Sequence, residues 1–332
     1  MSTLIIINNA AAKARHAWPI VKKQLDEANF KYEAYETKTA GDATIVTRSA
    51  LRNGINSIAV IGGDGTLSEV AEGFFQLSDN LDLLPTPINP DATLAILPSG
   101  TGDDFARGLR GERAPLKNWI TTLLQRDASE TLKVDVLYGR CDDYEKAFIC
   151  LNASTMGIGG ETAARVAGQS ELMRRFPGEF RFLVAALGAL AAWRERRVRV
   201  TVDGRTFVDG PMNLVGVANG LYAGGGMMFT PEARVDDGKL DVVTASGLSR
   251  ANVVKELSRV HRAGHVNNPK VKITNGEIVR IETFLLQDAL KIEADGNVRG
   301  VTPVQFQIMP AALKFLIPDR RLSADYSDHI EA

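Results

Sequence analysis

The amino-acid sequence predicts an α/β N-terminal domain with a parallel sheet, joined to a mostly antiparallel β domain, with a cleft between the two. Three observations predict this fold. The chain has 332 residues, which is long for a single hydrophobic core. Its first third alternates strand-like and helical runs, the order that builds parallel sheets. After about Leu132, strand-like runs follow one another directly, separated by glycine-containing turns.

The N-terminal domain is expected to span residues 1–134. Apolar runs mark its strands, helical spacing marks its helices, and Asn53-Gly54 ends one helix with a C-cap signal. In chain order we expect strand Leu4–Asn8, helix Trp18–Ala28, strand Lys31–Glu36, helix Ala43–Arg52, strand Ser57–Ile61, helix Leu67–Phe75 and strand Thr93–Leu97. Helices between the strands imply right-handed crossovers and a sheet covered on both faces.

The second domain is expected to span residues 135–312, with the tail at about 313–332 returning to the first. Glycines and Asp-Gly pairs such as Asp203-Gly204 provide its turns. The expected strands are Lys146–Ala153, Val198–Val202, Met212–Ala218, Leu240–Thr244, Ile278–Thr283, Ala289–Ala294 and Val304–Met309. Two helical stretches, Glu171–Arg197 and Asn252–Arg262, interrupt them. No flexible linker is apparent, so the two domains should pack closely.

Whole-chain properties narrow the class of protein. A formal net charge of −1 argues against a generally basic surface, so no nucleic-acid partner is expected. Two cysteines, Cys141 and Cys150, are too few for a disulfide framework and fit a reduced, cytoplasmic setting. Met1–Asn8 lacks the basic flank and long apolar core of a signal peptide. The most apolar longer stretch, Phe180–Trp193, covers only about two-thirds of a bilayer, so no integral membrane protein is expected.

Two strand-to-helix junctions carry glycine together with Asp and Thr, at Gly62–Thr66 and at Ser99–Asp104. Glycine allows backbone N–H groups to approach an anion at the carboxyl end of a parallel strand. Thr66 and Thr101 can add hydroxyl donors, whereas Asp64 must cap a helix, orient a loop or hold Mg²⁺ through water. A tight turn with an Asp cap is the alternative for either junction alone. Neither junction has the G-x-x-x-x-G-K-[ST] or G-x-G-x-x-G pattern.

The runs Gly62–Val70 and Leu97–Arg107 resemble the catalytic domain of the diacylglycerol kinase family, which includes bacterial lipid kinases and the sphingosine and ceramide kinases. Further matches near the C-terminus extend the resemblance over essentially the whole chain. It implies an N-terminal domain like that of NAD kinase and phosphofructokinase, and a β-sandwich C-terminal domain. It also implies ATP binding at Gly63, Asp64, Gly65, Thr66, Leu67, Ser68, Glu69 and Thr101, and at Thr37, although Thr39 lies nearby.

The candidate catalytic base is Asp295, within Ala294-Asp295-Gly296 and upstream of Met309–Leu313. The family's Asp-Gly-Glu triplet has its general base at this Asp, which receives the acceptor's hydroxyl proton. By pattern alone an Asp-Gly hairpin turn is favoured, and position relative to the Pro-Ala-Ala-Leu ending reverses that preference.

Pro231–Asp241 resembles the loop that holds a structural Mg²⁺ in bacterial members. Residue by residue, the implied ligands are the Asp237 carboxylate and the backbone carbonyls of Arg234 and Lys239, an oxygen-only set that suits Mg²⁺. A plain Asp-Gly turn is an equal alternative. The family also has an Asp at Asp135 near the active-site Mg²⁺, for which a solvent-facing strand Asp is the alternative.

Three positions depart from the family pattern. Ser68 stands where Asn is commoner, Asp103 replaces the first residue of an Asn-Asp pair, and Asn297 replaces the Glu of the triplet. Ser and Asp keep an acceptor but lose the amide donor, and Asn297 adds no charge. We therefore expect activity with altered tuning.

Eight arginines and three acids lie between Arg165 and Arg199, flanking the apolar stretch Phe180–Trp193. Such a helix could lie on an anionic membrane surface. For most of its apolar residues, which include Phe182, Leu183, Leu187, Leu190 and Trp193, packing on the β domain is the favoured interpretation.

The expected function is an ATP- and Mg²⁺-dependent lipid kinase that is cytoplasmic and visits the inner face of the membrane. One alternative is an NAD-kinase-like enzyme with a soluble acceptor, although the C-terminal matches favour a lipid. The other is a nucleotide or lipid sensor without activity, for which the three departures are the only support. The sequence leaves open the acceptor lipid and whether the chain forms a homodimer.

Overall fold

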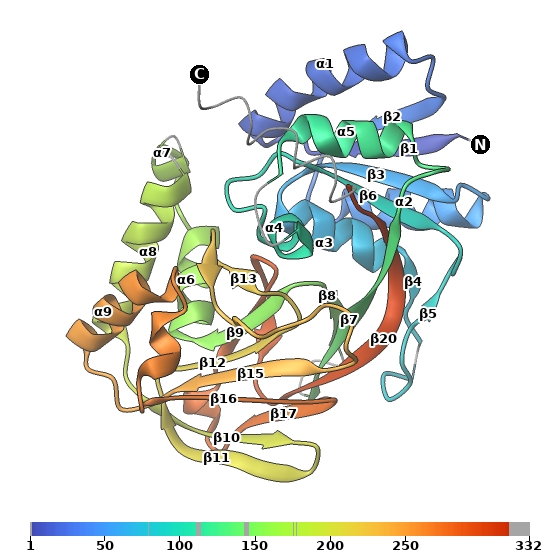
Figure 1. Ribbon diagram of the computed structural model, residues 1–332. Helices are drawn as coiled ribbons and strands as arrows, with labels where there is room; N and C mark the ends of the chain where they lie inside the picture. Colours follow the sequence, from blue (N-terminus) through green and yellow to red (C-terminus); the bar gives the residue numbers. More distant parts are fainter. Residues whose placement is uncertain are drawn as a thin grey trace. The chain divides into compact units, whose positions relative to one another are not determined.

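The computed structural model describes residues 2–78, 80–110, 114–142, 146–174, 176 and 178–318. The chain forms two compact units, which we treat separately (Figure 1). The first unit comprises Met1–Leu77, Pro85–Val134 and Ala311–Ala332, and the second comprises Ser78–Leu84 and Asp135–Pro310. Two strands, β7 (Thr131–Cys141) and β20 (Val304–Leu316), carry the chain from one unit into the other.

The first unit is an α/β domain with a parallel sheet, as predicted. Its strands are β1 (Thr3–Ile7), β2 (Tyr32–Glu36), β3 (Ser57–Gly62), β6 (Thr93–Pro98) and a short antiparallel pair, β4 (Phe75–Gln76) and β5 (Thr86–Pro87). The main sheet runs β2-β1-β3-β6, and Lys314–Leu316 at the end of β20 adds a further parallel partner for β6. Because β1 and β3 are central, all their residues are buried, whereas the edge strand β2 is half-exposed.

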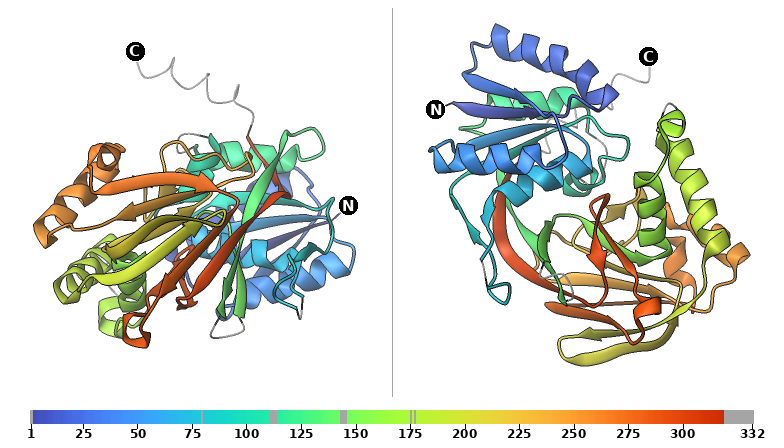
Figure 2. Two further views of the ribbon diagram at one scale, coloured as in Figure 1. Left: turned by 90° about the horizontal axis from the view of Figure 1, so that it is seen from below. Right: turned by 180° about the vertical axis from the view of Figure 1, so that it is seen from behind.

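Helices cover both faces of this sheet. They are α1 (Ala12–Glu27), α2 (Asp42–Arg52), α3 (Asp64–Gly73), α4 (Asp104–Arg110) and α5 (Leu116–Leu124). Helices α1 and α5 lie together on one face, and α2 and α3 lie together on the other (Figures 1 and 2). In α1 the buried residues Ala14, Ala17, Val21 and Leu25 follow helical spacing and form one inward stripe. Neither α4 nor α5 was predicted from the sequence.

The second unit is mostly antiparallel. Its strands are β8 (Lys146–Cys150), β9 (Ala153–Gly157), β10 (Arg196–Val202), β11 (Arg205–Met212), β12 (Leu214–Ala218), β13 (Tyr222–Ala223), β14 (Met227–Met228), β15 (Leu240–Ala245), β16 (Val271–Gly276), β17 (Ile278–Thr283), β18 (Lys291–Ala294) and β19 (Asn297–Val301). One sheet has the order β16-β15-β12-β9-β18-β19, and the other runs β11-β10-β17-β20. Apolar residues from both sheets, including Val217, Ile292, Val200 and Phe306, share one core, as in a β-sandwich.

The helices of the second unit are α6 (Ile158–Ala167), α7 (Glu171–Arg174), α8 (Gly178–Ala192) and α9 (Arg250–Val260), with short 3-10 turns η2 (Gly264–Asn267) and η3 (Leu286–Asp288). Helices α6 and α8 lie side by side (Figures 1 and 2). The prediction of one helix over Glu171–Arg197 is wrong, because α8 ends at Ala192 and strand β10 begins at Arg196. Alternating β-branched residues from Val198 to Val202 bury one side of that strand in the core.

The prediction of one strand over Lys146–Ala153 is also wrong. Strand β8 ends at Cys150 and β9 begins at Ala153, so Leu151 and Asn152 leave the ladder. The strand breaks here because the backbone N–H groups of Leu151 and Asn152 donate to the side chain of Asp295. A hydrophobicity pattern carries no signal for such a break.

Candidate active site

The two glycine-rich turns meet at the carboxyl edge of the parallel sheet. The β3–β6 ladder pairs Gly62 with Pro98, and the Ser99 N–H donates to the Gly62 carbonyl at 3.0 Å. Beyond the ladder, the backbones at Gly63 and Gly100 come so close that Gly100 has no room for a side chain and Gly63 has little. A Cβ on Gly100 would lie 2.6 Å from the Gly63 Cα, and one on Gly63 would lie 3.1 Å from the Gly100 Cα. Glycine at position 100 is therefore required for this contact between the turns.

Asp64, in the first turn, caps the helix that follows the second turn. Its carboxylate accepts the backbone N–H groups of Asp104 and Phe105 at 3.1 Å each, at the start of α4. Burial raises the pKa of Asp64 to about 7, and the nearby Asp104 carboxylate adds to this shift. These two hydrogen bonds make helix capping the role that Asp64 has in this structure.

Asp103 makes the corresponding contact within its own turn. Its Oδ1 accepts the Gly100 N–H at 2.7 Å, and its backbone adopts φ of +49°. Asn and Asp are the non-glycine residues that best tolerate this left-handed region, and both offer a side-chain acceptor here. The replacement of Asn by Asp at this position therefore preserves the turn.

Two residues at this edge escaped the sequence analysis. Asn8 directly follows β1, and its Nδ2 donates to Thr66 Oγ1 at 2.7 Å. Lys13, near the start of α1, donates to the Gly100 carbonyl at 3.2 Å and brings a positive charge to the turns. The signal for Asn8 was available, because a polar residue that ends the first buried strand of a parallel sheet lies at the same edge as the other strand ends.

The other implied nucleotide-binding residues differ in exposure. Thr101 is exposed, whereas Leu67 and Ser68 are buried in α3, so any ligand contact of these two would come from the backbone. The Glu69 carboxylate accepts the Gly41 N–H at 3.1 Å.

Two threonines follow β2 close together. The Thr39 hydroxyl donates to Asp42 at 2.9 Å. Thr37 directly follows β2, and its N–H donates to the Ile7 carbonyl of β1 at 2.9 Å. Of the two, Thr39 is thus engaged in the turn that precedes α2.

In the second unit, Asp295 lies in the turn between β18 and β19 and is 7% exposed. Its Oδ2 accepts the Leu151 N–H at 2.7 Å, and its Oδ1 accepts the N–H groups of Asn152 at 3.0 Å and Ala153 at 3.2 Å. The Cys150 thiol also donates to Oδ1, at 3.3 Å. Burial, followed by the charge of Asp295, raises the pKa of Cys150 well above its usual value, which keeps the thiol protonated as a donor.

This hydrogen bonding fixes the Asp295 carboxylate and is uneven between its two oxygens. Of the four hydrogen bonds donated to it within the described part of the chain, Oδ1 accepts three and Oδ2 accepts one, so Oδ2 is the oxygen with room for a further donor. The Asp295 backbone has φ of +46°, followed by Gly296 with φ of +85°. The residue is thus both a hairpin turn and a buried, preorganised acceptor, so the two interpretations of Asp-Gly are not exclusive.

The loop implied as a Mg²⁺ site is fastened to Asp135. Asp237 Oδ1 accepts the Lys239 N–H at 3.1 Å, and Gly238 has φ of +73°, which makes an Asp-Gly turn. The Gly238 N–H donates to Asp135 Oδ2 at 2.6 Å, and the Asp135 N–H donates to the Val235 carbonyl at 2.7 Å. Asp135 is 2% exposed, so the alternative of a solvent-facing strand residue is wrong.

Carboxylates gather around the same loop. Asp241 is buried, and burial, then the charges of Asp237 and Glu232, raise its pKa to about 6. The Arg234 side chain pairs with Asp236 at 3.3 Å, so a metal ligand from Arg234 would have to be its backbone carbonyl. Within the described residues, no group of three or more His, Cys, Asp or Glu side chains is arranged to hold a metal ion. A metal here would need carbonyl ligands, as the sequence implied.

Helix α8 turns much of its apolar surface outward. Phe180, Leu183, Val184 and Leu187 are exposed and share one face at spacings of three and four residues. The inward face uses other residues of this segment, namely Ala185, Ala189, Leu190 and Trp193. The expectation that most of its apolar residues pack inward holds for Leu190 and Trp193 but is wrong for Phe182, Leu183 and Leu187. Small alanines let α8 approach α6 closely, and the larger residues then project from the other side.

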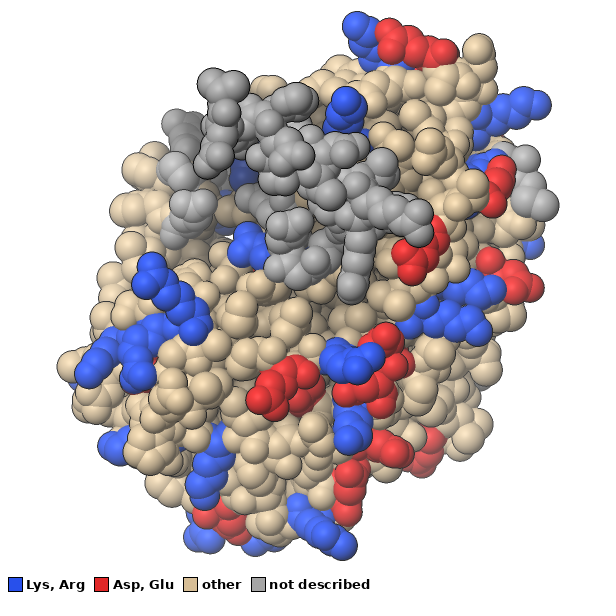
Figure 3. All heavy atoms as spheres, viewed as in Figure 1, with Lys and Arg blue, Asp and Glu red and all other residues tan. Residues whose placement is uncertain are grey.

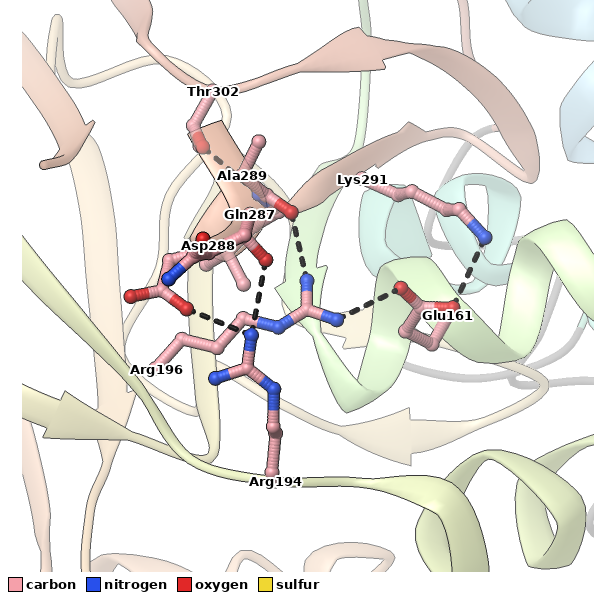
Figure 4. A network of polar contacts seen from close by, with 9 residues as sticks. Glu161, Arg194, Arg196, Gln287, Asp288, Ala289, Lys291 and Thr302 are labelled. Atoms are coloured by element: carbon pink, nitrogen blue, oxygen red, sulfur yellow. Dashed lines mark hydrogen bonds and ion pairs between the residues drawn. The ribbon is translucent and has the colours of Figure 1, made fainter. Parts of the chain in front are cut away.

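The arginines after α8 are largely paired. Arg194 contacts Asp288 at 2.9 Å, Arg196 approaches Glu161 at 3.6 Å, and Lys291 also binds Glu161, at 3.0 Å (Figure 4). Arg197 and Arg199 both contact Asp209, at 3.0 and 2.7 Å respectively. Arg175 lies outside the described residues, as do the side chains of Arg174, Glu171 and Glu179.

On the face shown in Figure 3, Lys and Arg side chains occur together with Asp and Glu side chains, some in contact and others separated by uncharged surface. Among the helices of the described residues, none is both long and apolar enough to cross a membrane.

Comparison with known proteins agrees with this geometry. Residues 2–137 match the family described as "Diacylglycerol kinase catalytic domain", and residues 156–317 match "YegS C-terminal NAD kinase beta sandwich-like domain". A diacylglycerol kinase of Staphylococcus carnosus is 28% identical over 305 residues, covering 91% of this chain and 90% of its own. A diacylglycerol kinase of Mycobacterium tuberculosis is 27% identical over 286 residues, covering 84% of this chain and 82% of its own.

A protein of Xanthomonas euvesicatoria named "Probable lipid kinase YegS-like" is 27% identical over 279 residues, covering 84% of each chain. Solved structures from Bacillus anthracis str. Sterne share the fold. One has a TM-score of 0.70 at 22% identity and covers 97% of this chain and 98% of its own. Another, a diacylglycerol kinase, has a TM-score of 0.64 at 21% identity and covers 95% of this chain and 96% of its own. The chain therefore belongs to the diacylglycerol kinase catalytic-domain family and is a phosphotransferase of the lipid-kinase class.

Proposed function

We propose that the protein is an ATP-dependent lipid kinase that transfers the γ-phosphoryl group to the hydroxyl of a membrane lipid such as diacylglycerol. The observation that carries this proposal is the contact between the glycine turns at Gly63 and Gly100. Such a contact places main-chain N–H groups of two strand ends at one edge without side chains in the way, which suits a triphosphate.

The residues around these turns would hold the nucleotide as follows. Backbone N–H groups at Gly63 and Gly65 would face phosphate oxygens, and the exposed Thr101 hydroxyl would add a donor. Lys13 would offset phosphate charge, since its Nζ already lies against the second turn. Asp64 would act indirectly by capping α4, because a carboxylate cannot bind phosphate itself. Thr37 is the better nucleotide contact of the two threonines, because Thr39 is engaged by Asp42.

In the proposed reaction Asp295 is the general base. The lipid hydroxyl gives its proton to Asp295 Oδ2 while its oxygen bonds to the γ-phosphorus, and the bond from that phosphorus to the β–γ bridging oxygen breaks to release ADP. Three N–H groups and a thiol hold the carboxylate in one orientation for this step. Mg²⁺ bound with ATP would supply charge neutralisation.

We also propose a structural Mg²⁺ at the Asp237 carboxylate and the carbonyls of Arg234 and Lys239. All three donors are oxygens, as Mg²⁺ prefers. Asp241 supports the proposal, because burial first and then the negative charges of Asp237 and Glu232 raise its pKa, and a divalent cation would offset those charges.

The outward face of α8, defined as Phe180, Leu183, Val184 and Leu187, is proposed to contact the anionic membrane surface that contains the lipid acceptor. An apolar helical stripe that lies exposed is suited to the headgroup boundary. Because Arg194, Arg196, Arg197 and Arg199 have acidic partners, apolar contact should contribute more than charge.

The test combines the full chain with γ-labelled ATP, Mg²⁺ and vesicles of phosphatidylcholine and phosphatidylglycerol that contain diacylglycerol. Mass spectrometry should detect phosphorylated lipid that is absent without Mg²⁺ or with Asp295→Asn, while ATP affinity stays within about threefold. Asp209→Asn, which removes two surface ion pairs in the same unit, is the matched control and should keep turnover.

A parallel reaction with NAD in place of vesicles tests the soluble-acceptor alternative. Labelled NADP without labelled lipid would replace the lipid proposal, and ATP binding without any product would indicate a sensor. Undiminished turnover by Asp295→Asn would remove Asp295 from the role of base.

A further inference from the structure

A second carboxylate, that of Glu293, lies behind Asp295 in the same hairpin. Glu293 Oε1 accepts the Gly296 N–H at 2.6 Å, and Glu293 Oε2 accepts the Thr155 hydroxyl at 2.6 Å. Thr155 is the direct neighbour of Glu293 in the ladder between β9 and β18. One side chain therefore ties the tip of the hairpin to the central strand beside it.

Glu293 closes a turn with an uncommon backbone conformation. Asp295 and Gly296 both have positive φ, at +46° and +85°, a region that Asp tolerates better than most non-glycine residues. The Asp295 N–H donates to the Ala153 carbonyl at 3.0 Å, which fixes one side of the turn. The bond from Gly296 to Glu293 fixes the other side. The direction of the Asp295 side chain thus depends on both contacts.

We propose that Glu293 is a positioning residue for Asp295. The inference rests on the proposed kinase function. A hydrogen bond to an ionised acceptor is stronger than one to a neutral acceptor, so ionised Glu293 holds the Gly296 N–H, and with it the direction of the Asp295 side chain, more firmly. Hydrogen bonds from Thr155 and Gly296 keep Glu293 in place in either charge state.

The surroundings determine when that charge is present. Burial raises the pKa of Glu293 to about 7, the bonds from Thr155 and Gly296 oppose the shift, and Asp295 adds to it. Cys150 on β8 lies near both carboxylates and near Arg299 of β19, and its own pKa is raised by burial. On the adjoining helix α6, Glu161 is paired with Lys291 and Arg196.

The sign of the pH dependence follows from these charges. Glu293 is protonated below about pH 7 and ionised above it. Turnover by the wild type should therefore rise through this range. Glu293→Gln keeps the size and an acceptor but never ionises, so it should lack the rise. We expect its kcat to be about tenfold below wild type at pH 8 and about equal at pH 5.5, with KM for ATP unchanged.

A further variant makes the test specific. Glu256→Gln, which alters another buried, hydrogen-bonded glutamate on α9, should follow the wild-type pH profile. A deficit in Glu293→Gln that is the same at every pH would mean a structural role alone and would overturn the proposal.

A measurement without turnover separates this inference from the proposed function. In protein labelled with ¹³C at Asp and Glu carboxyl groups, the Asp295 signal should move as Glu293 titrates, and Glu293→Gln should abolish that movement. An Asp295 signal that ignores Glu293 would overturn the inference whatever the activity. Failure of the wild type to phosphorylate lipid, with the two signals still coupled, would reject the proposed function and leave the carboxylate pair established.

Discussion

The side-chain amide of Asn219 donates to the backbone carbonyl of Leu151 at 3.1 Å and also to that of Asp135 at 2.8 Å. Leu151 belongs to the backbone break that holds the Asp295 carboxylate, whereas Asp135 holds the loop around Asp237. Asn219 is completely buried. One amide therefore links the supports of the candidate base and of the candidate Mg²⁺ loop.

Replacement of Asn219 should impair both supports together. Asn219→Ala leaves the carbonyls of Leu151 and Asp135 without this donor, which costs about 1–3 kcal/mol for each buried group left unsatisfied. We expect a loss of turnover of at least tenfold and a lower thermal midpoint. Asn213→Ala, which removes a comparable buried amide that bonds Leu248, is the control. It should lower stability with much less effect on kcat measured below its unfolding transition. Equal kcat losses in the two variants would show that Asn219 is merely structural.

The contact between Gly63 and Gly100 predicts intolerance of even one methyl group. In Gly100→Ala the new Cβ would lie 2.6 Å from both the Gly63 Cα and Asp103 Oδ1, so the turns must separate. ATP affinity, measured by calorimetry, should fall more than tenfold. Gly210→Ala provides the control, because a Cβ there meets nothing within 4 Å and its φ is ordinary. Retained ATP affinity in Gly100→Ala would place the nucleotide elsewhere.

The buried Asp64 predicts a pH dependence of stability. Its pKa is about 7 in the folded protein against an ordinary value of 3.8, so the folded state binds the proton more tightly than the unfolded state. Unfolding free energy should therefore fall as pH rises from about 4 to 7, by on the order of 1–3 kcal/mol. Asp64→Asn cannot ionise and should lack this fall.

Thermal or urea unfolding at pH 4.5, 6 and 8 measures the effect of Asp64. Asp127 is exposed, so Asp127→Asn should show the same pH dependence of the unfolding free energy as the wild type. A parallel pH dependence in wild type and Asp64→Asn would contradict the assigned burial of this carboxylate.

The sequence was sufficient for the parts of the site that depend on local pattern. The ends of β3 and β6 and the two glycine turns follow from apolar runs that stop at Gly62 and Pro98. Long-range contacts had no such signal. The capping of α4 by Asp64 joins residues 40 positions apart, and the bond from Asn152 to Asp295 joins residues 143 apart.

Pattern also failed where packing overrides hydrophobicity. In α8, Ala185 and Ala189 face inward, whereas the larger Phe180, Leu183 and Leu187 face outward, a choice that hydrophobicity alone does not favour. Helices α6 and α8 lie side by side, and Gly188 of α8 lies near the Arg165 side chain of α6. The partner helix thus decided the orientation, and the sequence of α8 alone does not contain that information.

The outward face of α8 predicts a specific defect at membranes. Leu183 and Leu187 are 54% and 50% exposed and one helical turn apart, so Leu183→Glu with Leu187→Glu should leave the core unaffected. Binding to phosphatidylglycerol-containing vesicles, measured by sedimentation, should fall at least tenfold because two apolar groups become charged. Activity towards a short-chain, water-soluble diacylglycerol should persist.

A matched variant distinguishes membrane contact from general loss of apolar surface. Ile45→Glu changes a residue of α2 in the first unit that is 66% exposed, and vesicle binding should remain at the wild-type level. The wild type should bind neutral phosphatidylcholine vesicles more weakly than anionic vesicles. This loss of binding should be smaller than the loss caused by the double glutamate substitution, because the arginines that follow α8 are paired with acids. If the double variant binds anionic vesicles as the wild type does, the membrane contact lies on another surface.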